Sequence, residues 1–146
     1  MSDRPALRAL ERKLLRAPRR RPFSSPEWTA DVPPIAGVYG IWDVRRHCLI
    51  YIGETSDLQL RFRDLRRAVN HTFTKKVRGY LRVASSTSDQ DVRSLMCKRF
   101  ELAFLPVPFG RRELEEYLVI RFRATLINKP ANRLLSGPQY QWVRPA

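Results

Sequence analysis

Residues 37–54 read GVYGIWDVRRHCLIYIGE, and this stretch decides the fold. Its two apolar halves are rich in aromatic and β-branched residues, as β-strands are, and the polar residues around Arg45 suit a hairpin loop. A loop centred on Arg45 would place Tyr39 directly opposite Tyr51, so that both phenols point to the same face of the sheet. A slip of one residue would put them on different faces.

The rest of the chain carries further helix and strand patterns. Residues 56–59, Ser-Asp-Leu-Gln, form a possible capping box, and Leu58, Phe62, Leu65 and Val69 then make one apolar helical stripe. Further along, the sequence predicts a basic helix over residues 72–83, a loop over residues 84–91, a strand over residues 100–105 and a long helix over about residues 111–125.

The residues before the hairpin form a separate segment in the sequence. Leucines at helical spacing predict a short helix over roughly residues 4–16, and a stretch rich in Pro and Arg follows it. This stretch either lies along a nucleic-acid backbone or is pinned to the domain by Phe23 and Trp28. The chain is therefore expected to comprise a basic N-terminal arm (1–34), a compact domain (35–132) and a C-terminal tail (133–146).

The composition is strongly basic. The 146 residues include 28 Lys and Arg against 14 Asp and Glu, which gives a formal net charge of +14. Clustered positive charge of this size favours nucleic acid as a partner, ahead of a simple compositional bias toward Arg. Two cysteines cannot form a disulfide framework, and no apolar run suits a signal peptide or a membrane span. We therefore expect a soluble, cytoplasmic protein with no membrane partner, in an oligomeric state that the sequence leaves open.

Two charged residues lie at or inside apolar helical stripes. Arg61 falls at the edge of its stripe, where a guanidinium can bind a phosphate oxygen, although a snorkelling arginine with a carboxylate partner has the same pattern. Glu115 falls within an apolar cluster, with Leu118 and Val119 three and four residues further on. A carboxylate there needs a partner, and the alternatives are a hard metal ion such as Mg²⁺ and an ion pair, for example with Arg61.

Four further residues are candidates because of where they fall in these patterns. Tyr39 and Tyr51 are ordinary packed tyrosines when taken singly, but as a pair near Arg61 they predict a phenol that ionises more easily and takes a proton from water. His71 precedes the basic helix and is a candidate proton relay or phosphate contact. Asn128 lies just past the long helix, where it either caps that helix or holds the site together.

Taken together, these residues make the chain resemble the GIY-YIG nuclease superfamily over roughly residues 35–132. The matching motifs occur in order along the chain: Gly37-Val38-Tyr39, Tyr51-Ile52-Gly53-Glu54-Thr55-Ser56-Asp57-Leu58, Arg61, Leu114-Glu115 with Leu118-Val119, and Leu126-Ile127-Asn128. The order of all five elements makes the resemblance specific. The spacing between the last two motifs fits Glu116 about as well as Glu115, and Asn132 competes with Asn128.

The resemblance implies a small α/β (α+β) fold in which helices flank a three-stranded, mainly antiparallel sheet. It also implies metal-dependent hydrolysis of a phosphodiester bond, with Tyr39 as the general base or the water-positioning phenol. Tyr51 would help orient the attack or the scissile phosphate. Arg61 would neutralise charge on the phosphoryl oxygens, and Glu115 would bind a single Mg²⁺ or Mn²⁺.

Two residues complete the site that the resemblance implies. Asn128 would hold the site in shape, and His71 resembles a histidine that some members of the superfamily place after the arginine helix. The leading hypothesis is a divalent-metal-dependent DNA endonuclease. The alternative is a nucleic-acid-binding module that keeps the nuclease fold without cutting. The sequence leaves open the choice between DNA and RNA, the substrate specificity and the biological role.

Overall fold

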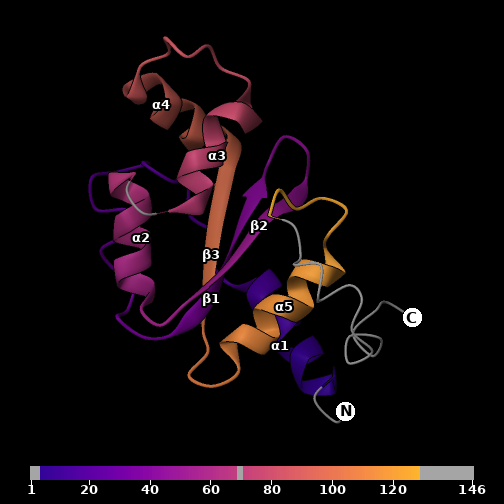
Figure 1. Cartoon of the computed structure of the whole chain (residues 1–146). Helices are drawn as coiled ribbons and strands as arrows, with labels where there is room; N and C mark the ends of the chain where they lie inside the picture. Colours follow the sequence, from indigo (N-terminus) through magenta and orange to yellow (C-terminus); the bar gives the residue numbers. More distant parts are fainter. Residues whose placement is uncertain (1–3, 69–70, 129–146) are drawn as a thin grey trace.

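The computed structural model describes residues 4–68 and 71–128 of the chain. These residues form one antiparallel sheet of three strands with helices on both of its faces (Figure 1). The predicted α/β (α+β) fold, a small three-stranded sheet flanked by helices, is confirmed. The elements in chain order are α1 (Arg4–Arg16), β1 (Gly37–Asp43), β2 (Cys48–Thr55), α2 (Leu58–Arg67), α3 (Thr72–Leu81), α4 (Asp89–Arg99), β3 (Phe100–Pro106) and α5 (Arg111–Arg121).

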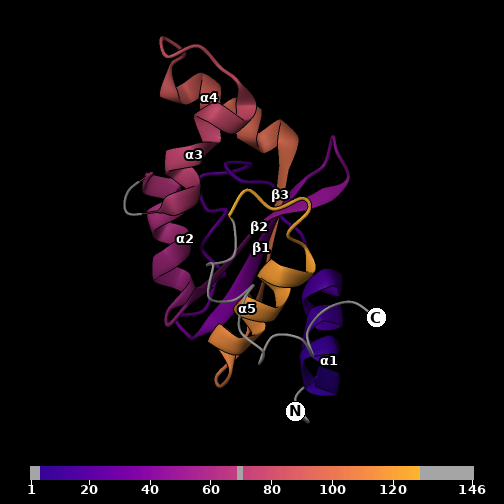
Figure 2. The same cartoon turned by 45° about the vertical axis from the view of Figure 1, so that its right-hand side comes forward.

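The sheet separates two hydrophobic cores. Its central strand, β1, lies between β2 and β3, and alternate residues of β1 point to opposite faces. Val38 packs in the core that contains leucines of α1 and α5, whereas Tyr39 and Ile41 pack in the core that contains apolar residues of α2, α3 and α4. The two groups of helices lie on opposite sides of the sheet in both ribbon views (Figure 2).

The register of the hairpin differs from the predicted one. Tyr39 is paired with Gly53 and Tyr51 with Ile41, so the two tyrosines are diagonal neighbours and not directly opposed. The prediction was wrong because residues 44–47 form a four-residue turn and a β-bulge next to Ile41 adds one more residue to β2. The combined shift is two residues, an even number, so both phenols still lie on the same face.

Helix α2 has the predicted stripe but a different cap. Asp57, and not Ser56, is the N-cap residue, and its side chain accepts a hydrogen bond from the backbone N–H of Leu60 at 3.0 Å. The stripe residues Leu58, Phe62 and Leu65 are buried as predicted, and Val69 lies outside the described residues.

Helix α4 was missed because the predicted loop over residues 84–91 contains its start. The side chain of Ser88 accepts a hydrogen bond from the backbone N–H of Asp91 at 3.1 Å, so the polar residues supply a helix cap. Only Val92 and Met96 of α4 are buried, which leaves almost no apolar period to recognise.

The other two helices after α2 are shorter than predicted. Helices α3 and α5 end at Leu81 and Arg121, before their predicted ends at residues 83 and 125. Among the helices of the described residues, none combines the length and the apolar character needed to cross a bilayer.

The segment before the sheet packs against it. Arg20 and Leu102 exchange two backbone hydrogen bonds, of 2.9 and 2.8 Å, so Arg20 covers the outer edge of β3. Trp28 is buried, and the centroid of its ring lies 5.3 Å from that of Phe23. Of the two alternatives for this segment, pinning by Phe23 and Trp28 agrees with the observed packing.

A buried carboxylate, Asp43, joins the end of the hairpin to the helical layer. Its two oxygens accept hydrogen bonds from Nε and Nη2 of Arg99, each at 3.0 Å, and from the hydroxyl of Tyr80. Oδ1 also accepts the backbone N–H groups of Arg45 and Arg46. Burial alone would raise the pKa of Asp43, but these hydrogen bonds outweigh it and hold the pKa below its usual value.

We expect the substitution Asp43→Asn to lower the free energy of unfolding by about 2–3 kcal/mol at pH 7, because it leaves the guanidinium of Arg99 without its carboxylate. A depressed pKa gives stability that is present above the unfolded-state value of 3.8 and is lost as the pH falls. Urea denaturation at several pH values should therefore show the two proteins converging in acid.

The control for this experiment is Asp31→Asn, which breaks an exposed ion pair with Arg20. It should cost less than about 1 kcal/mol. Equal losses in the two variants would contradict the role assigned to Asp43.

Candidate active site

The hydroxyl of Tyr39 lies at the centre of the candidate site. Tyr39 and His71 are both buried, and the Tyr39 oxygen lies 3.0 Å from Nε2 of His71. Nδ1 of His71 accepts a hydrogen bond from the backbone N–H of Phe73, at 3.1 Å, where α3 begins. Because a neutral imidazole has a single N–H, that proton is on Nε2, and His71 donates it to the Tyr39 oxygen.

His71 acts within the fold as a positioning residue. Burial and then the charge of Arg61 lower the pKa of His71 to about 3, so the ring is neutral at physiological pH. The predicted roles, a proton relay or a phosphate contact, need a ring that gains a proton or reaches the surface. The geometry instead has His71 orienting the Tyr39 hydroxyl and capping α3.

Arg61 lies between the buried phenol and the surface. Its Nε lies 3.4 Å from the Tyr39 oxygen, to which it donates, and Nη1 lies 3.9 Å from the carboxylate of Asp64. The side chain is 24% exposed, which agrees with its predicted place at the edge of the α2 stripe. A planar, permanently charged group in this position can bind a phosphate oxygen while it contacts the phenol.

Tyr51 lies beside this cluster. Its ring centroid is 6.2 Å from that of Tyr39 and 6.0 Å from that of His71. Burial raises the pKa of both tyrosines, and the charge of Arg61 only partly opposes it. Burial therefore opposes ionisation of both phenols in the protein alone, and easier ionisation beside a cation and a metal stays a prediction.

The two tyrosines differ in their hydrogen bonds and in their exposure. The Tyr39 oxygen accepts from His71 and Arg61, so its own proton is left to donate. For Tyr51, burial raises the pKa, and Thr72, Arg61 and Tyr39 nearby partly oppose this effect. Tyr51 is also the more exposed phenol, at 5% against 1% for Tyr39. Tyr51 is thus the phenol that lies nearer to the surface.

Gly53 makes room for the ring of Tyr39. A Cβ atom at Gly53 would lie 2.3 Å from Cζ of Tyr39 and 2.4 Å from its hydroxyl oxygen, far inside van der Waals contact. The Tyr39 ring therefore lies directly over the backbone of β2. This contact gives the Tyr-Ile-Gly sequence a structural reason: the glycine allows the neighbouring strand to hold Tyr39 in place.

Glu115 comes from α5, on the opposite side of the sheet from α2. Burial, together with the smaller effects of the nearby carboxylates of Glu54 and Glu116, raises the pKa of Glu115 to about 7. The charge of Glu115 in turn acts on Tyr51, so the two side chains lie within electrostatic reach across β2, the edge strand. Among residues 4–68 and 71–128, no ion pair or hydrogen bond to the Glu115 carboxylate is found, so the alternative to a metal ion, an ion pair with Arg61, is absent there.

The donor set at Glu115 suits a hard divalent cation. Mg²⁺ usually retains several waters and takes only one or two carboxylates from a protein. Glu115 supplies one that is partly buried and has a raised pKa, and Glu54 is a neighbouring carboxylate that accepts a hydrogen bond from Arg111 at 2.8 Å. In the described part of the chain, no three His, Cys, Asp or Glu side chains form a fuller metal-binding group. The residues present therefore fit a hydrated Mg²⁺ or Mn²⁺ better than a protein-enclosed metal.

Asn128 holds the outer edge of β2 and does not cap α5. Its Nδ2 donates to the backbone oxygen of Ile52 at 2.6 Å, and its Oδ1 accepts from the N–H of Ile52 at 3.3 Å. The preceding N–H, of Ile127, donates to the backbone oxygen of Ile50 at 2.7 Å. The strand that carries Tyr51 is thereby fixed from both sides. The competing Asn132 lies outside the described residues.

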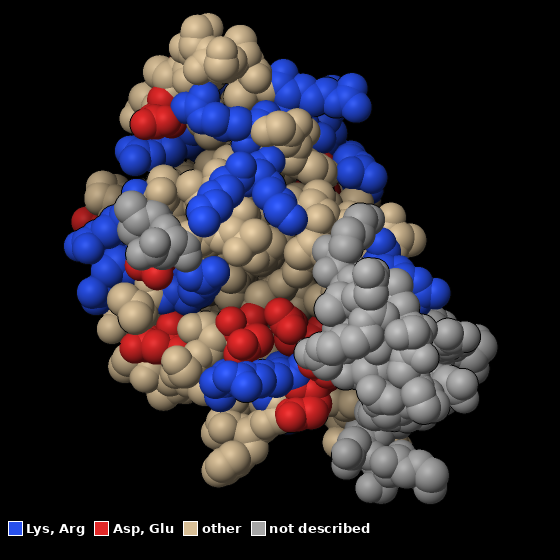
Figure 3. Space-filling view, viewed as in Figure 1, with Lys and Arg blue, Asp and Glu red and all other residues tan. Residues whose placement is uncertain are grey.

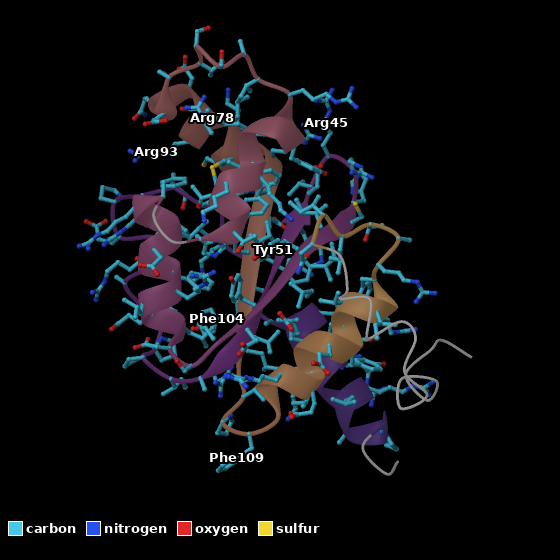
Figure 4. The ribbon with its side chains drawn as sticks, in the orientation of Figure 1. Arg45, Tyr51, Arg78, Arg93, Phe104 and Phe109 are labelled. Atoms are coloured by element: carbon cyan, nitrogen blue, oxygen red, sulfur yellow. The ribbon has the colours of Figure 1, made fainter. Side chains whose placement is uncertain are left out.

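The face that carries these residues has an uneven charge distribution. Lys and Arg gather over α2 and α3, and Asp and Glu gather near the start of α5, on either side of an uncharged central area (Figure 3). Tyr51 lies in this central region, between the two groups of helices (Figure 4). A phosphate group and a cation would therefore meet complementary charge on opposite sides of the site.

The sequence reasoning gave no role in the site to Glu54, although it belongs to the matching motif, or to Arg111. Glu54 follows the Tyr-Ile-Gly motif directly and raises the pKa of Glu115, while Arg111 opens α5 and pairs with Glu54. The usable signal was the position of Glu54 at the end of β2, one residue beyond the glycine that supports Tyr39.

Comparison of the chain with protein-family models, with curated proteins and with solved structures found no match. The resemblance to the GIY-YIG nuclease superfamily therefore rests on the motifs and their geometry, and it stays a prediction.

We expect the substitution Glu115→Gln to stabilise the protein at pH 8. The folded-state pKa of about 7 exceeds the ordinary value of 4.5, so the carboxylate lowers stability as the pH rises through this interval. After allowance for solvent screening, the gain should be about 1–2 kcal/mol at pH 8 and should vanish near pH 4.5. Urea denaturation at the two pH values measures it.

Glu113→Gln, on the exposed side of the first turn of α5, is the matched control and should slightly lower stability, because it removes a favourable charge at the helix N-terminus. A Glu115→Gln protein that is less stable than wild type at pH 8 would mean that the carboxylate has a stabilising partner.

His71 offers a separate test of the hydrogen-bond assignment. Nitrogen-15 NMR of the imidazole should show the proton on Nε2 and no second protonation until the pH approaches 3. Arg61→Ala should raise the pKa of His71, because it removes a nearby positive charge. A proton on Nδ1 would contradict the assigned direction of the bond to Tyr39.

Proposed function

We propose that this protein is a divalent-metal-dependent endonuclease that hydrolyses phosphodiester bonds in DNA. The observation that carries the proposal is the contact of Arg61 and His71 with a single buried phenol, Tyr39. Tyr51 lies beside this group and is electrostatically coupled to Glu115. The net charge of +14 adds a sequence-independent attraction for a polyanion.

Each residue has a role that its surroundings favour. Arg61 would bind a non-bridging oxygen of the scissile phosphate, because it is charged and accessible at the edge of the buried cluster. Tyr51, whose ring lies beside those of Tyr39 and His71, would orient the attacking water or the phosphate. Tyr39 would act through Tyr51 and Arg61 as a positioning residue, since its raised pKa disfavours a role as general base.

Glu115 would hold the cation, with Glu54 as a neighbouring carboxylate. A bound Mg²⁺ or Mn²⁺ supplies Lewis-acid stabilisation of the leaving oxygen and lowers the pKa of water. The cation would also favour the ionised form of Glu115, which removes the cost of that carboxylate in the free protein. Asn128 would keep β2 and Tyr51 in place. We propose the cytoplasm as the compartment in which this activity occurs.

The test is nicking of supercoiled plasmid with Mg²⁺, with Mn²⁺ and with chelator. Wild-type protein should nick only with a divalent cation, and Arg61→Ala and Glu115→Ala should each lower the rate by about 10²–10³-fold. Binding of the same plasmid in chelator should persist in Glu115→Ala, because it depends on phosphate contacts spread over the surface.

Glu116→Ala is the matched control, since it removes an adjacent carboxylate of the same helix. It should retain activity, and loss of nicking in this variant would reassign the metal ligand to Glu116. Plasmid binding without any nicking by the wild type would favour the alternative, a nucleic-acid-binding module that does not cut.

A further inference from the structure

A pocket away from the candidate site has the chemistry of a nucleotide-binding site. It has a volume of about 660 Å³ and lies between the segment before the sheet, α2 and α4. Phe23 and Trp28 line it together with three cationic side chains, Arg66, Arg93 and Lys98. Arg93, on α4, lies at the outer edge of the molecule and away from Tyr51 (Figure 4).

The positive charge of this pocket is not neutralised by nearby carboxylates. Within residues 4–68 and 71–128, no ion pair involves Arg66, Arg93 or Lys98. By contrast, Arg20, in the N-terminal segment that also contains Phe23 and Trp28, is paired with Asp31. The guanidinium of Arg93 lies 5.5 Å from the ring centroid of Phe23. Cations grouped around an aromatic surface favour a ligand that combines negative charge with a flat ring.

Trp28 forms a buried part of the wall of this pocket. The residue is 5% exposed, and its indole N–H, which is buried, has no hydrogen-bond partner among the described residues. Because this nitrogen has almost no accessible surface, a molecule in the pocket would contact the Trp28 ring and not its N–H.

The pocket is also linked to the candidate site. Arg66 follows Arg61 by five residues on α2, which corresponds to about 7.5 Å along the helix axis. The ring centroid of Trp28 lies 6.3 Å from that of Phe62, which lies 5.7 Å from that of Tyr39. Arg66 and Trp28 thus connect the pocket to the helix and the core that carry the candidate site.

We propose that this pocket binds an unpaired nucleotide of the DNA substrate, with its phosphate among Arg66, Arg93 and Lys98 and its base near Phe23. The inference rests on the proposed function. A pocket of this volume suits a nucleotide-sized ligand, and a paired base would have to leave the duplex to enter it. The preferred substrate is therefore a duplex with a single-stranded segment beside the cleaved bond.

Binding in chelator tests this proposal without any cutting step. Fluorescence anisotropy would compare a blunt duplex with the same duplex carrying a single-stranded thymidine overhang. Wild-type protein should bind the overhang duplex about tenfold more tightly, and the double substitution Arg66→Ala, Arg93→Ala should abolish the difference. Equal affinity of the wild type for both DNAs, or an equal loss on both in the variant, would overturn the proposal.

The charge-matched control is the double substitution Arg12→Ala, Lys13→Ala, on the exposed side of α1. It removes the same charge and should weaken binding to both DNAs equally, so that the preference for the overhang remains. Because the assay contains no divalent cation, failure of the nuclease proposal would appear only in the nicking experiment, and failure of the pocket proposal only here.

A direct measurement guards against a variant that fails to fold. In protein labelled with ¹⁵N-tryptophan, Trp28→Phe would identify the Trp28 indole signal. Adding 5′-phosphorylated oligothymidylate in chelator should shift this signal in the wild type. No shift would overturn the proposal, and the same shift with equimolar inorganic phosphate would overturn the assignment to a nucleotide.

Discussion

The candidate site depends on the hydrogen bond between the Tyr39 hydroxyl and Nε2 of His71. Both groups are buried, so neither has water as a substitute partner, and the loss of one would leave the other unsatisfied. This bond joins the central strand to the start of α3, because His71 also caps that helix. The position of Arg61 follows from it, since the guanidinium contacts the oxygen that His71 already holds. One buried phenol thus aligns groups from β1, α2 and α3.

Glu115 has the opposite character, because nothing in the described fold satisfies it. Its raised pKa results from burial and from the carboxylates of Glu54 and Glu116, and such an arrangement opposes folding at neutral pH. Functional sites commonly retain residues of this kind, which are unfavourable for the protein alone and favourable once a ligand is bound. The site therefore has two parts. Around Tyr39 the hydrogen bonds of the buried side chains are formed, whereas on α5 the charged form of Glu115 is disfavoured.

Much of the fold could be predicted from local sequence patterns, because the strands and α2 have strong apolar periods. The hairpin register could not, since a bulge near Ile41 depends on how two strands pack and not on the residues of either alone. Helix α4 was missed because its cap residues also favour loops. For the site, Tyr39, Tyr51 and Arg61 were grouped correctly, whereas the burial that raises the pKa of both phenols is a property of the assembled cores.

The small sheet also has both of its outer strands covered by its own chain. Arg20 bonds to the outer side of β3, and Ile127 and Asn128 bond to the outer side of β2. Exposed strands otherwise act as templates for pairing between molecules, which leads to aggregation. With these backbone groups already occupied, another copy of the chain cannot extend the sheet at those points. If the protein gathers along DNA, as proposed, these contacts would oppose intermolecular β-association where its local concentration is highest.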